Sequence, residues 1–466
     1  MKDRPDLPPG PYLVVGLARS GIAAALALRA RGERVVGVDG TEPTGLDTLA
    51  AAGVELHVGE RGLAPLDRVS TVVKSPGVPA EAPVIAAARA RGIEVMGELE
   101  LAWRMLPNQF IAVTGTNGKT TTVELIGHIH REAGLPVAVA GNVGTALSSL
   151  VEAIDEHATI VCEASSFQLE DTLAFAPQAA VLLNVSPDHL DRHATMREYV
   201  EAKLQIFARQ GEGDVAVLPA DFELDRMPPG PRLVLFGGVS GGSPVGAPLD
   251  RPRPATGASA GERRLDMCVV DGVLRWEHEP LIEVGALSLR GAHNVQNAMA
   301  AAAVCLARGT DPAAVREGLR TFPGVPHRLQ EAGRVDGVLY VNDSKATNVA
   351  STLVALDAMA GDELPVHLIL GGQGKGQDFA PLLPSVERTC RAVYLIGEDA
   401  PSIERALSGC AVPVTICETL ERAVDRARAY ARPGEVVLLS PGCASFDQFA
   451  DFEARGERFR ELVAHR

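Results

Sequence analysis

The chain has few aromatic residues, few cysteines and no long apolar run. Phe, Trp and Tyr make up only 4% of its 466 residues. The seven cysteines include no CxxC pair, so neither a disulfide framework nor a zinc knuckle is expected, and a reducing compartment suits them. No stretch approaches the ~18 uninterrupted apolar residues of a membrane span, and the first residues, MKDRPDLPPGPY, lack the apolar core of a signal peptide. We therefore expect a soluble cytoplasmic protein.

Basic residues are also in the minority. There are 44 Lys and Arg against 59 Asp and Glu, which gives a formal net charge of −15. This balance argues against broad contact with the phosphates of a nucleic acid, although local basic pockets for phosphate groups remain compatible with it. The apolar fraction of 46% and the 47 glycines are typical of a globular chain with many tight turns.

The N-terminal part predicts a nucleotide-binding sheet. An apolar run over 12–15 leads into the glycine turn 16–21 and a helical stretch over 22–31, and a second apolar run ends at Asp39. Strand, glycine turn, helix, strand and acid open a doubly wound sheet. The same pattern approximates the dinucleotide fingerprint, so a nicotinamide-dependent oxidoreductase is one interpretation.

Two further units follow in the same alternating style. The second begins near Glu98 and the third after the Pro/Gly-rich segment 322–326, whereas 227–264 reads as loops, hairpins or an insertion. Predicted strands cover 71–74, 110–114, 159–162, 179–184, 215–218, 338–342, 366–370, 392–396 and 436–439, and predicted helices cover 98–105, 123–132 and 294–308. The prediction is an α/β protein of three domains, 1–98, 99–324 and 325–466. The first and third domains are predicted to be Rossmann-like, and the second is predicted to be P-loop ATPase-like with a mainly parallel sheet.

The strongest motif is a phosphate-binding loop. Gly115, Thr116, Asn117, Gly118, Lys119, Thr120 and Thr121 stand between an apolar strand and a helical segment. In that context backbone amides and the lysine can hold the phosphates of ATP, and the hydroxyl of Thr120 can bind Mg²⁺. The alternative is a chance glycine turn, which the combined strand, Gly-Lys-Thr and helix make much less probable.

Candidate metal ligands follow along the chain. Glu163 ends an apolar run at the edge where ligands of a parallel sheet gather, and the alternative is an acid at a helix N-terminus. His189 and His193 are four residues apart but have no third nitrogen or sulfur partner for zinc, so solvated loop histidines are the plainer interpretation. Lys203 taken alone reads as a solvent-facing helix lysine.

Ten strings in chain order carry a resemblance to a known family. The central strings are GTNGKTTT (115–122), GNVG (141–144), EASSFQLE (163–170), SPDHLDRH (186–193) and YVEAK (199–203). The later strings are GAHNVQNAMAA (291–301), PHRLQ (326–330), VNDSKATN (341–348), LILGGQGKGQDF (368–379) and LLSPGCASFDQF (438–449). The first five resemble the central domain of the Mur ligases, and the others resemble the branch of that family that adds D-glutamate.

The resemblance implies an ATP- and Mg²⁺-dependent enzyme of peptidoglycan precursor synthesis. It implies three domains, which bind UDP-N-acetylmuramoyl-L-alanine, ATP and, in part, D-glutamate. ATP would phosphorylate the alanyl carboxylate, and the amine of D-glutamate would then displace phosphate. Small-molecule substrates are the expected partners, with no nucleic acid or membrane, and we expect a monomer.

The resemblance also assigns roles to single residues. Lys119 would stabilise the transferred phosphoryl group, Thr120 and Glu163 would hold one magnesium ion, and His189 and a carbamylated Lys203 would hold a second. The implied ATP contacts beyond the loop are Asn297, Arg328 and Asp343. The implied substrate contacts are Ser20, Asp39, Ser75, Gly77, Asn142 and Ser166 for the UDP-linked acceptor, and Lys345, Thr347, Lys375, Ser445 and Phe452 for D-glutamate.

Some features depart from the family pattern, and other functions stay open. Gly40 follows Asp39 where some members carry threonine and arginine, and Gln373 stands where many members carry an acid. The intact string 343–348 favours D- over L-glutamate as the amino acid. Besides the oxidoreductase, a folate polyglutamate synthetase would share the phosphate loop, and a non-enzymatic UDP-sugar-binding module would share the N-terminal sheet.

Overall fold

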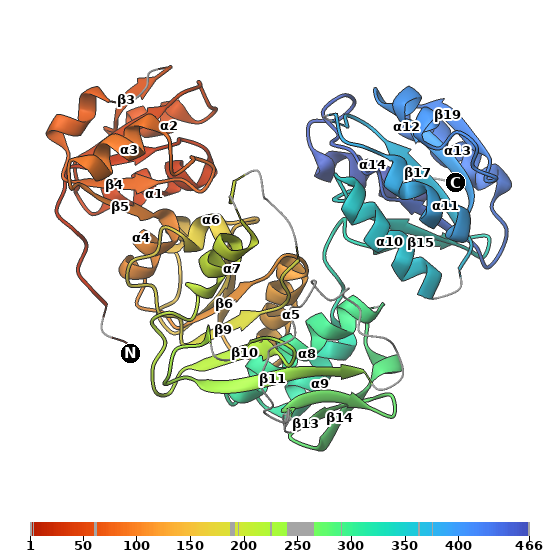
Figure 1. Ribbon diagram of the computed structural model, residues 1–466, viewed down its shortest axis with the longest axis horizontal. Helices are drawn as coiled ribbons and strands as arrows, with labels where there is room; N and C mark the ends of the chain where they lie inside the picture. Colours follow the sequence, from red (N-terminus) through yellow and green to blue (C-terminus); the bar gives the residue numbers. More distant parts are fainter. Residues whose placement is uncertain are drawn as a thin grey trace, which may run out of the picture. The chain divides into compact units, whose positions relative to one another are not determined.

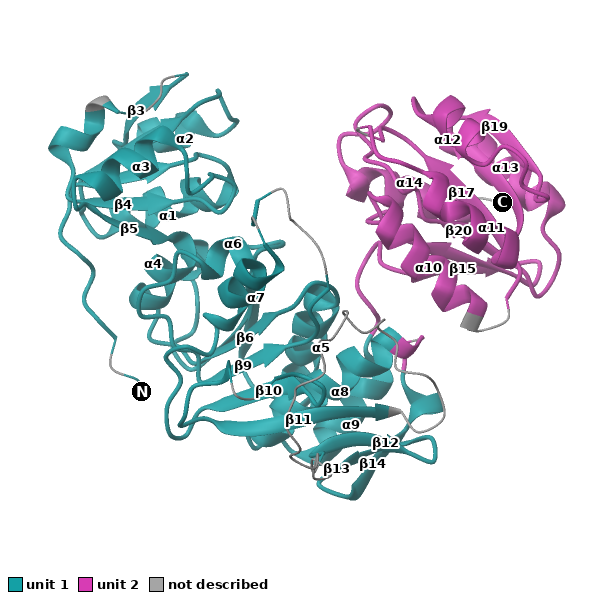
Figure 2. Cartoon of the chain, in the orientation of Figure 1, with its two compact units in different colours: residues 1–287, 293–322 teal, residues 288–292, 323–466 magenta. Residues whose placement is uncertain are grey.

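The chain folds into two compact units. The computed structural model describes residues 2, 4–59, 63–186, 192–193, 195–223, 226–239, 265–289, 291–361, 364–374 and 376–464. One unit comprises residues 1–287 and 293–322, and the other comprises 288–292 and 323–466 (Figure 2). The first unit contains two sheets and the second contains one, so three sheets build an α/β chain. The exact limits of three domains stay a prediction.

The first sheet is fully parallel, with strand order β3-β2-β1-β4-β5 (Figure 1). Its strands are β1 (Tyr12–Val15), β2 (Val35–Asp39), β3 (Glu55–Val58), β4 (Thr71–Lys74) and β5 (Glu94–Gly97), and its helices are α1 (Arg19–Ala30), α2 (Leu46–Ala51), the short 3-10 helix Ala64–Arg68 and α3 (Pro83–Ala90). The strand order reverses between β1 and β4. Ligands of open α/β sheets bind at this switch point, beyond the carboxyl ends of the strands.

The second sheet has nine strands in the order β14-β13-β12-β11-β10-β9-β6-β8-β7. Its strands are β6 (Phe110–Thr114), β7 (Val137–Gly141), β8 (Thr159–Glu163), β9 (Ala179–Leu182), β10 (Val215–Pro219), β11 (Arg232–Val239), β12 (Met267–Val270), β13 (Val273–Trp276) and β14 (Glu279–Glu283). Its helices are α4 (Glu98–Met105), α5 (Lys119–Glu132), α6 (Ser166–Leu169), α7 (Met196–Leu204), α8 (Ala292–Ala307), α9 (Pro312–Thr321) and the short 3-10 helices Leu147–Leu150 and Val284–Ala286. The strands from β7 to β12 pair in parallel, and β12 to β14 form antiparallel pairs at one edge.

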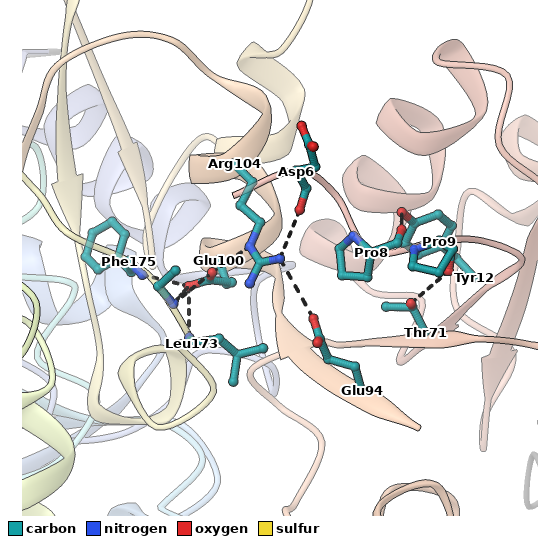
Figure 3. Close-up of polar contacts among 11 residues, drawn as sticks. Asp6, Pro8, Pro9, Tyr12, Thr71, Glu94, Glu100, Arg104, Leu173 and Phe175 are labelled. Atoms are coloured by element: carbon teal, nitrogen blue, oxygen red, sulfur yellow. Dashed lines mark hydrogen bonds and ion pairs between the residues drawn. The ribbon is translucent and has the colours of Figure 1, made fainter. Parts of the chain in front are cut away.

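Helix α4 is fixed to the second sheet by a buried carboxylate (Figure 3). Glu100 is fully buried and accepts hydrogen bonds of 2.9–3.0 Å from the backbone amides of 173–175. Arg104 donates to Glu100 at 2.7 Å, donates to the carbonyl of Asp6 at 3.2 Å, and lies 3.8 Å from Glu94 of β5. A buried charge is tolerated when it is paired and hydrogen-bonded, so this cluster holds the first sheet against the second.

The second unit contains a six-stranded sheet in the order β15-β16-β20-β17-β18-β19, in which only the β15–β16 pair is antiparallel. Its strands are β15 (Gln330–Val335), β16 (Val338–Asn342), β17 (Val366–Gly371), β18 (Cys390–Ile396), β19 (Val414–Glu418) and β20 (Val436–Leu439). Its helices are α10 (Val349–Gly361), α11 (Leu383–Thr389), α12 (Ala400–Ala406), α13 (Leu420–Tyr430), α14 (Phe452–Ala464) and the short 3-10 helix Ala380–Leu382. Apolar clusters on both faces of the sheet form its core.

The predicted α/β class with mainly parallel sheets is confirmed. Each predicted strand and helix has a counterpart, with ends that shift by a few residues. The structure adds strands that the sequence did not reveal, among them β3, β5, β7, β15 and β19, and β12 to β14, which follow the predicted insertion 227–264. Residues 240–264 of the predicted insertion lie outside the described part of the chain. Within that described part, no helix combines the length and apolar character that crossing a bilayer requires.

Candidate active site

The phosphate loop joins a buried strand to a helix N-terminus. Residues 115–118 connect β6 to α5, and Gly118 is the N-cap of α5 with φ of 84°. Thr116 donates its amide to the carbonyl of Asn184 at 3.0 Å, and Asn117 donates its amide to the side-chain oxygen of the same asparagine at 2.9 Å. The loop therefore lies at the carboxyl edge of the sheet, where backbone amides of α5 are available to an anion.

Asn297 lies against this loop, although it is far away in the sequence. It is buried on α8, and a Cβ atom built on Gly118 would lie 2.2 Å from its side-chain oxygen. Asn297 also donates to the side chain of Asn294 at 3.1 Å. The resemblance implied that Asn297 contacts ATP at its adenine. The structure places Asn297 against the phosphate loop, and its amide side chain could form hydrogen bonds with a base.

We predict that Gly118→Ala raises the KM for ATP at least tenfold. The new methyl group meets Asn297 and the left-handed backbone at this position disfavours a side chain, so the loop must shift. The matched control is Gly134→Ala, because Gly134 has φ of 67° and nothing within 4 Å of the added atom. Steady-state kinetics with varied ATP would measure both variants. Equal KM values for ATP in Gly118→Ala and Gly134→Ala would contradict this placement of Asn297.

A threonine and a glutamate meet beneath the loop. The hydroxyl of Thr120 donates to Glu163 at 2.8 Å, and both side chains are buried. The other carboxylate oxygen of Glu163 accepts from the side chain of Asn142 at 3.1 Å. Glu163 is the last residue of β8, so the predicted carboxylate lies at the sheet edge, and it precedes the N-cap of α6, Ser165.

Two lysines point at the same loop. The ammonium of Lys119 donates to the carbonyls of Gly115 at 3.0 Å and Thr116 at 2.9 Å. The ammonium of Lys203 donates to the carbonyl of Gly115 at 2.8 Å and lies 4.4 Å from the ring centre of Tyr199. Lys203 is only 2% exposed, so the interpretation as a solvent-facing helix lysine is wrong. Burial beside a phosphate loop is costly for a lysine and favours a functional role.

The histidine pair has two different outcomes. His189 lies outside the described residues. His193 is 6% exposed, stacks on Phe167 with ring centres 5.3 Å apart, and shares a 3.0 Å hydrogen bond with the hydroxyl of Ser166. The interpretation of His193 as a solvated loop residue is therefore wrong, because an aromatic ring and a hydroxyl satisfy it inside the protein.

The described oxygen donors can accept a magnesium ion. The Thr120 hydroxyl and the Glu163 carboxylate are hard oxygen ligands that already contact each other. The second oxygen of Glu163 accepts from the side-chain amide of Asn142, a neutral group. Lys203 supplies no oxygen as an unmodified amine, so it would need carbamylation to serve as a ligand. The donor set thus fits Mg²⁺ at Thr120 and Glu163, and fits it at Lys203 only after that modification.

A cavity of about 510 Å³ opens at the switch point of the first sheet. Ser20, Asp39, Ser75, Gly77 and Asn142, all of which the resemblance predicted as acceptor contacts, line it. Arg19 and Gln168 also line the cavity. Asn142, which lines the cavity, donates to Glu163, so one wall of the cavity is hydrogen-bonded to the carboxylate that meets Thr120.

The geometry of Asp39 differs from that of a dinucleotide-binding acid. One carboxylate oxygen accepts from the amide of Leu17 at 2.7 Å, and the other accepts from the amide and hydroxyl of Thr41 at 2.8 Å. Burial opposes ionisation, but these hydrogen bonds outweigh it and lower the pKa of Asp39. The carboxylate is therefore hydrogen-bonded to the glycine turn. In the dinucleotide fingerprint, the acid instead accepts a hydrogen bond from a ribose hydroxyl.

In the second unit, Arg328 and Asp343 form a local pair of predicted ATP contacts. Asp343 follows β16 and accepts from the amide of Leu329 at 3.2 Å and from the hydroxyl of Ser440 at 2.7 Å. Arg328 lies between His327 and Leu329, whose φ values of 61° and 43° are unusual for residues with side chains. Such backbone strain is often maintained at functional sites, which supports a role for Arg328.

The predicted D-glutamate residues gather at the ends of β16 and β20. The ammonium of Lys345 lies 4.2 Å from the ring centre of Phe452, and Ser445 is 2% exposed. Arg455 is almost fully buried beneath them and donates to the carbonyls of Ser344 at 2.8 Å and Cys443 at 3.1 Å. Thr347 is partly exposed before α10, and Lys375 lies outside the described residues.

Comparisons with known proteins match each part of the chain to one family. Residues 11–97 match the Mur ligase MurD-like N-terminal domain, residues 113–238 match the Mur ligase middle domain, and residues 327–443 match the Mur ligase glutamate ligase domain. The chain belongs to the Mur ligase family. It is a ligase by this membership.

Two curated relatives with the same name are similar to the chain over nearly its whole length. UDP-N-acetylmuramoylalanine–D-glutamate ligases of Anaeromyxobacter dehalogenans and Myxococcus xanthus are each 42% identical to it, and coverage is 98% of both chains for the first and 97% of both for the second. The solved structure of UDP-N-acetylmuramate–alanine ligase from Thermotoga maritima aligns over 98% of this chain and 99% of its own, with a TM-score of 0.59 and 20% identity. Thermotoga maritima MurF in complex with ADP aligns over 92% and 94%, with a TM-score of 0.55 and 16% identity. These two structures show that the fold is shared across the Mur ligases.

Several residues of this Mur ligase site were not predicted from the sequence. Asn184 holds the phosphate loop, Gln168 lines the cavity, and Arg455 supports the segments that follow two strands, β16 and β20. Asn184 and Gln168 stood inside or beside recognised strings, so their position was a usable signal. Arg19 lies in the predicted glycine turn 16–21 and Arg455 lies outside the predicted elements, and no recognised string singles out either of them.

We predict that Asp343→Asn changes how stability depends on pH. Burial raises the pKa of Asp343 to about 7, against the usual value of 3.8, and the hydrogen bonds from Ser440 and Leu329 only partly offset this. The folded chain therefore holds the proton more tightly than the unfolded chain, so the wild-type protein loses roughly 1–4 kcal/mol of stability as the pH rises from about 4 to 7. Asparagine removes that loss, and the Tm advantage of the variant should be greater at pH 8 than at pH 5. Asp425→Asn, on an exposed face of α13, is the control. A Tm difference that stays constant between the two pH values would contradict the prediction.

Proposed function

We propose that this Mur ligase joins D-glutamate to UDP-N-acetylmuramoyl-L-alanine in an ATP-dependent reaction of peptidoglycan precursor synthesis. The observation that carries the proposal is the meeting of Lys119, Thr120 and Glu163 at one loop, with Asn142 linking Glu163 to the nucleotide cavity. The full-length similarity to D-glutamate-adding relatives supports the choice of substrates. A cavity that carries several polar side chains and a phosphate loop in one unit suit an acceptor that must meet ATP.

The acceptor would bind across the first unit. Its UDP part would occupy the cavity beside Ser20, Asp39, Ser75 and Gly77, and its alanyl carboxylate would reach past Asn142 towards Glu163. A volume of about 510 Å³ lies within the range of small-molecule sites. Ser166, on α6 close to Glu163, would contact the same end of the acceptor.

The first chemical step would activate the carboxylate. One alanyl oxygen attacks the γ-phosphorus of ATP, the bond to the β-bridging oxygen breaks, and ADP leaves with that electron pair. Lys119 and the amides of 115–118 would neutralise charge on the transferred phosphoryl group. Mg²⁺ held by Thr120 and Glu163 would supply further charge neutralisation.

The second step would form the amide. The neutral amine of D-glutamate attacks the acyl carbon, the amine loses a proton, and inorganic phosphate leaves with one oxygen of the original carboxylate. Lys345, Lys375, Thr347 and Ser445 would bind the two carboxylates of D-glutamate through charge-assisted hydrogen bonds. Arg328 and Asp343 of the second unit would supply further contacts to ATP, as the resemblance implies.

The proposal also includes four features of the protein itself. Lys203 is carbamylated, Lys203 and His189 bind a second magnesium ion, the protein is located in the cytoplasm, and it is a monomer. A folate polyglutamate synthetase is the second candidate, because FolC of Escherichia coli shares the fold with a TM-score of 0.55, but its 17% identity gives no support beyond the fold.

The test is phosphate release from ATP and Mg²⁺ in the presence of UDP-N-acetylmuramoyl-L-alanine, with D-glutamate, L-glutamate or no amino acid. The proposal expects release that depends on D-glutamate and a product heavier by one glutamyl residue in mass spectrometry. Equal release with L-glutamate would overturn the stereochemical choice. Release in none of the three mixtures would overturn the proposed reaction.

A further inference from the structure

Lys74 is a fully buried lysine outside the groups that the proposed reaction uses. It is the last residue of β4, and its side chain is 0% exposed. Its ammonium lies 2.6 Å from a carboxylate oxygen of Asp171, which is 2% exposed, and 3.5 Å from Glu170. Lysine is almost never fully buried unless it is paired, so this contact between the first sheet and the segment after α6 is specific.

Asp171 is held by two neighbouring strand ends of the first sheet. Lys74 of β4 and Gly97 of β5 are partners in the parallel register. The amide of Gly97 donates to the backbone carbonyl of Asp171 at 3.0 Å, and a Cβ atom on Gly97 would lie 3.1 Å from the Cβ of Asp171. Asp171, which follows α6, thus forms an ion pair with the end of β4 and accepts a backbone hydrogen bond from the end of the adjacent strand β5.

The segments on either side of this contact form two walls of the nucleotide cavity. Ser75, directly after Lys74, lines the cavity and donates its hydroxyl to the carbonyl of Gly16 at 2.6 Å. Gln168, three residues before Asp171, lines the cavity from the other side and belongs to the capping box that begins α6 at Ser165. The ion pair therefore lies where the wall from the first sheet meets the wall from α6.

A buried ion pair is a poor source of stability but a good source of fixed geometry. The cost of removing both charges from water largely cancels their attraction, and apolar replacements of the same size are often equally stable. The contact also fixes a position, because the buried ammonium lies 2.6 Å from one oxygen of Asp171. Its presence beside a cavity is better explained by positioning than by stability.

We propose that Lys74 is a positioning residue, which holds the turn 75–77 against α6 through Asp171 and so pre-forms the site for a uridine diphosphate group. The inference rests on the proposed function for the identity of that ligand. A misplaced wall lowers the affinity for the nucleotide and shifts the acceptor carboxylate away from Glu163, and a displacement of about 1 Å can cost about a hundredfold in rate. The ATP loop lies on other elements and keeps its own geometry.

The experiment uses UDP as the probe and isothermal titration calorimetry as the measurement. Lys74→Met removes the charge at similar length, and the double variant K74M/D171L removes both charges, so that Asp171 is not left as a buried carboxylate without its lysine. The control is Lys2→Met, because Lys2 also forms an ion pair with a buried partner, Asp214, remote from the cavity. Thermal unfolding establishes that each variant is folded, and the KM for ATP is measured in parallel.

We expect both Lys74 variants to bind UDP at least tenfold more weakly than the wild-type protein, with a KM for ATP that changes less than threefold. Lys2→Met should bind UDP within twofold of the wild-type protein. A folded K74M/D171L variant that binds UDP within threefold of the wild-type value would overturn the inference, as would a wild-type protein that does not bind UDP. Failure of the proposed ligation shows separately, as absent phosphate release by a wild-type protein that still binds UDP.

Discussion

Lys203→Ala is expected to lower kcat at least about a thousandfold, with partial recovery when short carboxylic acids are added to the assay. Lys203 is buried and reaches the carbonyl of Gly115 in the phosphate loop. If its amine is carbamylated, the substitution removes an oxygen ligand and leaves a space that acetate or propionate can enter. Phosphate release with D-glutamate, measured with and without the acids, reports both the loss of kcat and its recovery.

The control for that loss is Lys2→Ala, which removes a lysine of the same unit from an ion pair with Asp214. It should keep kcat within threefold and show no response to the acids. Activity near the wild-type level in Lys203→Ala would exclude a metal-binding role for this residue. A large loss that no carboxylic acid relieves would leave Lys203 essential as an amine and contradict the carbamylation.

Glu163→Gln is expected to lower kcat about a hundred- to a thousandfold and to raise the Mg²⁺ concentration needed for half-maximal activity. The substitution keeps the shape of the side chain but removes the negative charge, and because the amide has one accepting oxygen, it can accept from Asn142 only if its NH2 group donates to the hydroxyl of Thr120. A magnesium titration of phosphate release measures the change. The stability of the protein should hardly fall, since a buried carboxylate becomes a neutral amide in the same network.

Glu132→Gln serves as the matched control, because Glu132 ends α5, the helix that follows the phosphate loop, and faces His128 at 3.8 Å. Its magnesium dependence should match that of the wild-type protein. An unchanged magnesium requirement in Glu163→Gln would show that the charge of Glu163 does not hold the metal.

The local parts of the site were predictable from the sequence. The phosphate loop is a contiguous string whose glycines, lysine and threonine act where they stand, and Glu163 ends a readable apolar run. Strands such as β6 and β20 were predictable because a buried parallel strand is an unbroken apolar segment. Asn297 was assigned only through the family resemblance, since no local pattern connects an asparagine on α8 to a loop about 180 residues earlier.

The missed elements share a physical reason. Strands β3 and β5 are four-residue edge strands with partly exposed residues, so their apolar pattern is too short to separate from a loop. Lys74 was missed for a different reason. A lysine at the end of a strand is expected to be exposed to solvent, and only the folded chain brings Asp171 next to it. Burial of a charge by a distant partner is a tertiary property that composition and periodicity do not contain.

The most direct test of the account follows an oxygen atom. The acceptor is prepared with both oxygens of the alanyl carboxylate replaced by ¹⁸O and is converted with ATP, Mg²⁺ and D-glutamate. If Lys119, Thr120 and Glu163 activate the carboxylate by phosphorylation, each turnover transfers one ¹⁸O to inorganic phosphate and leaves the other in the new amide. Inorganic phosphate without ¹⁸O, released together with the amide product, would contradict the acyl-phosphate route and the role assigned to the phosphate loop.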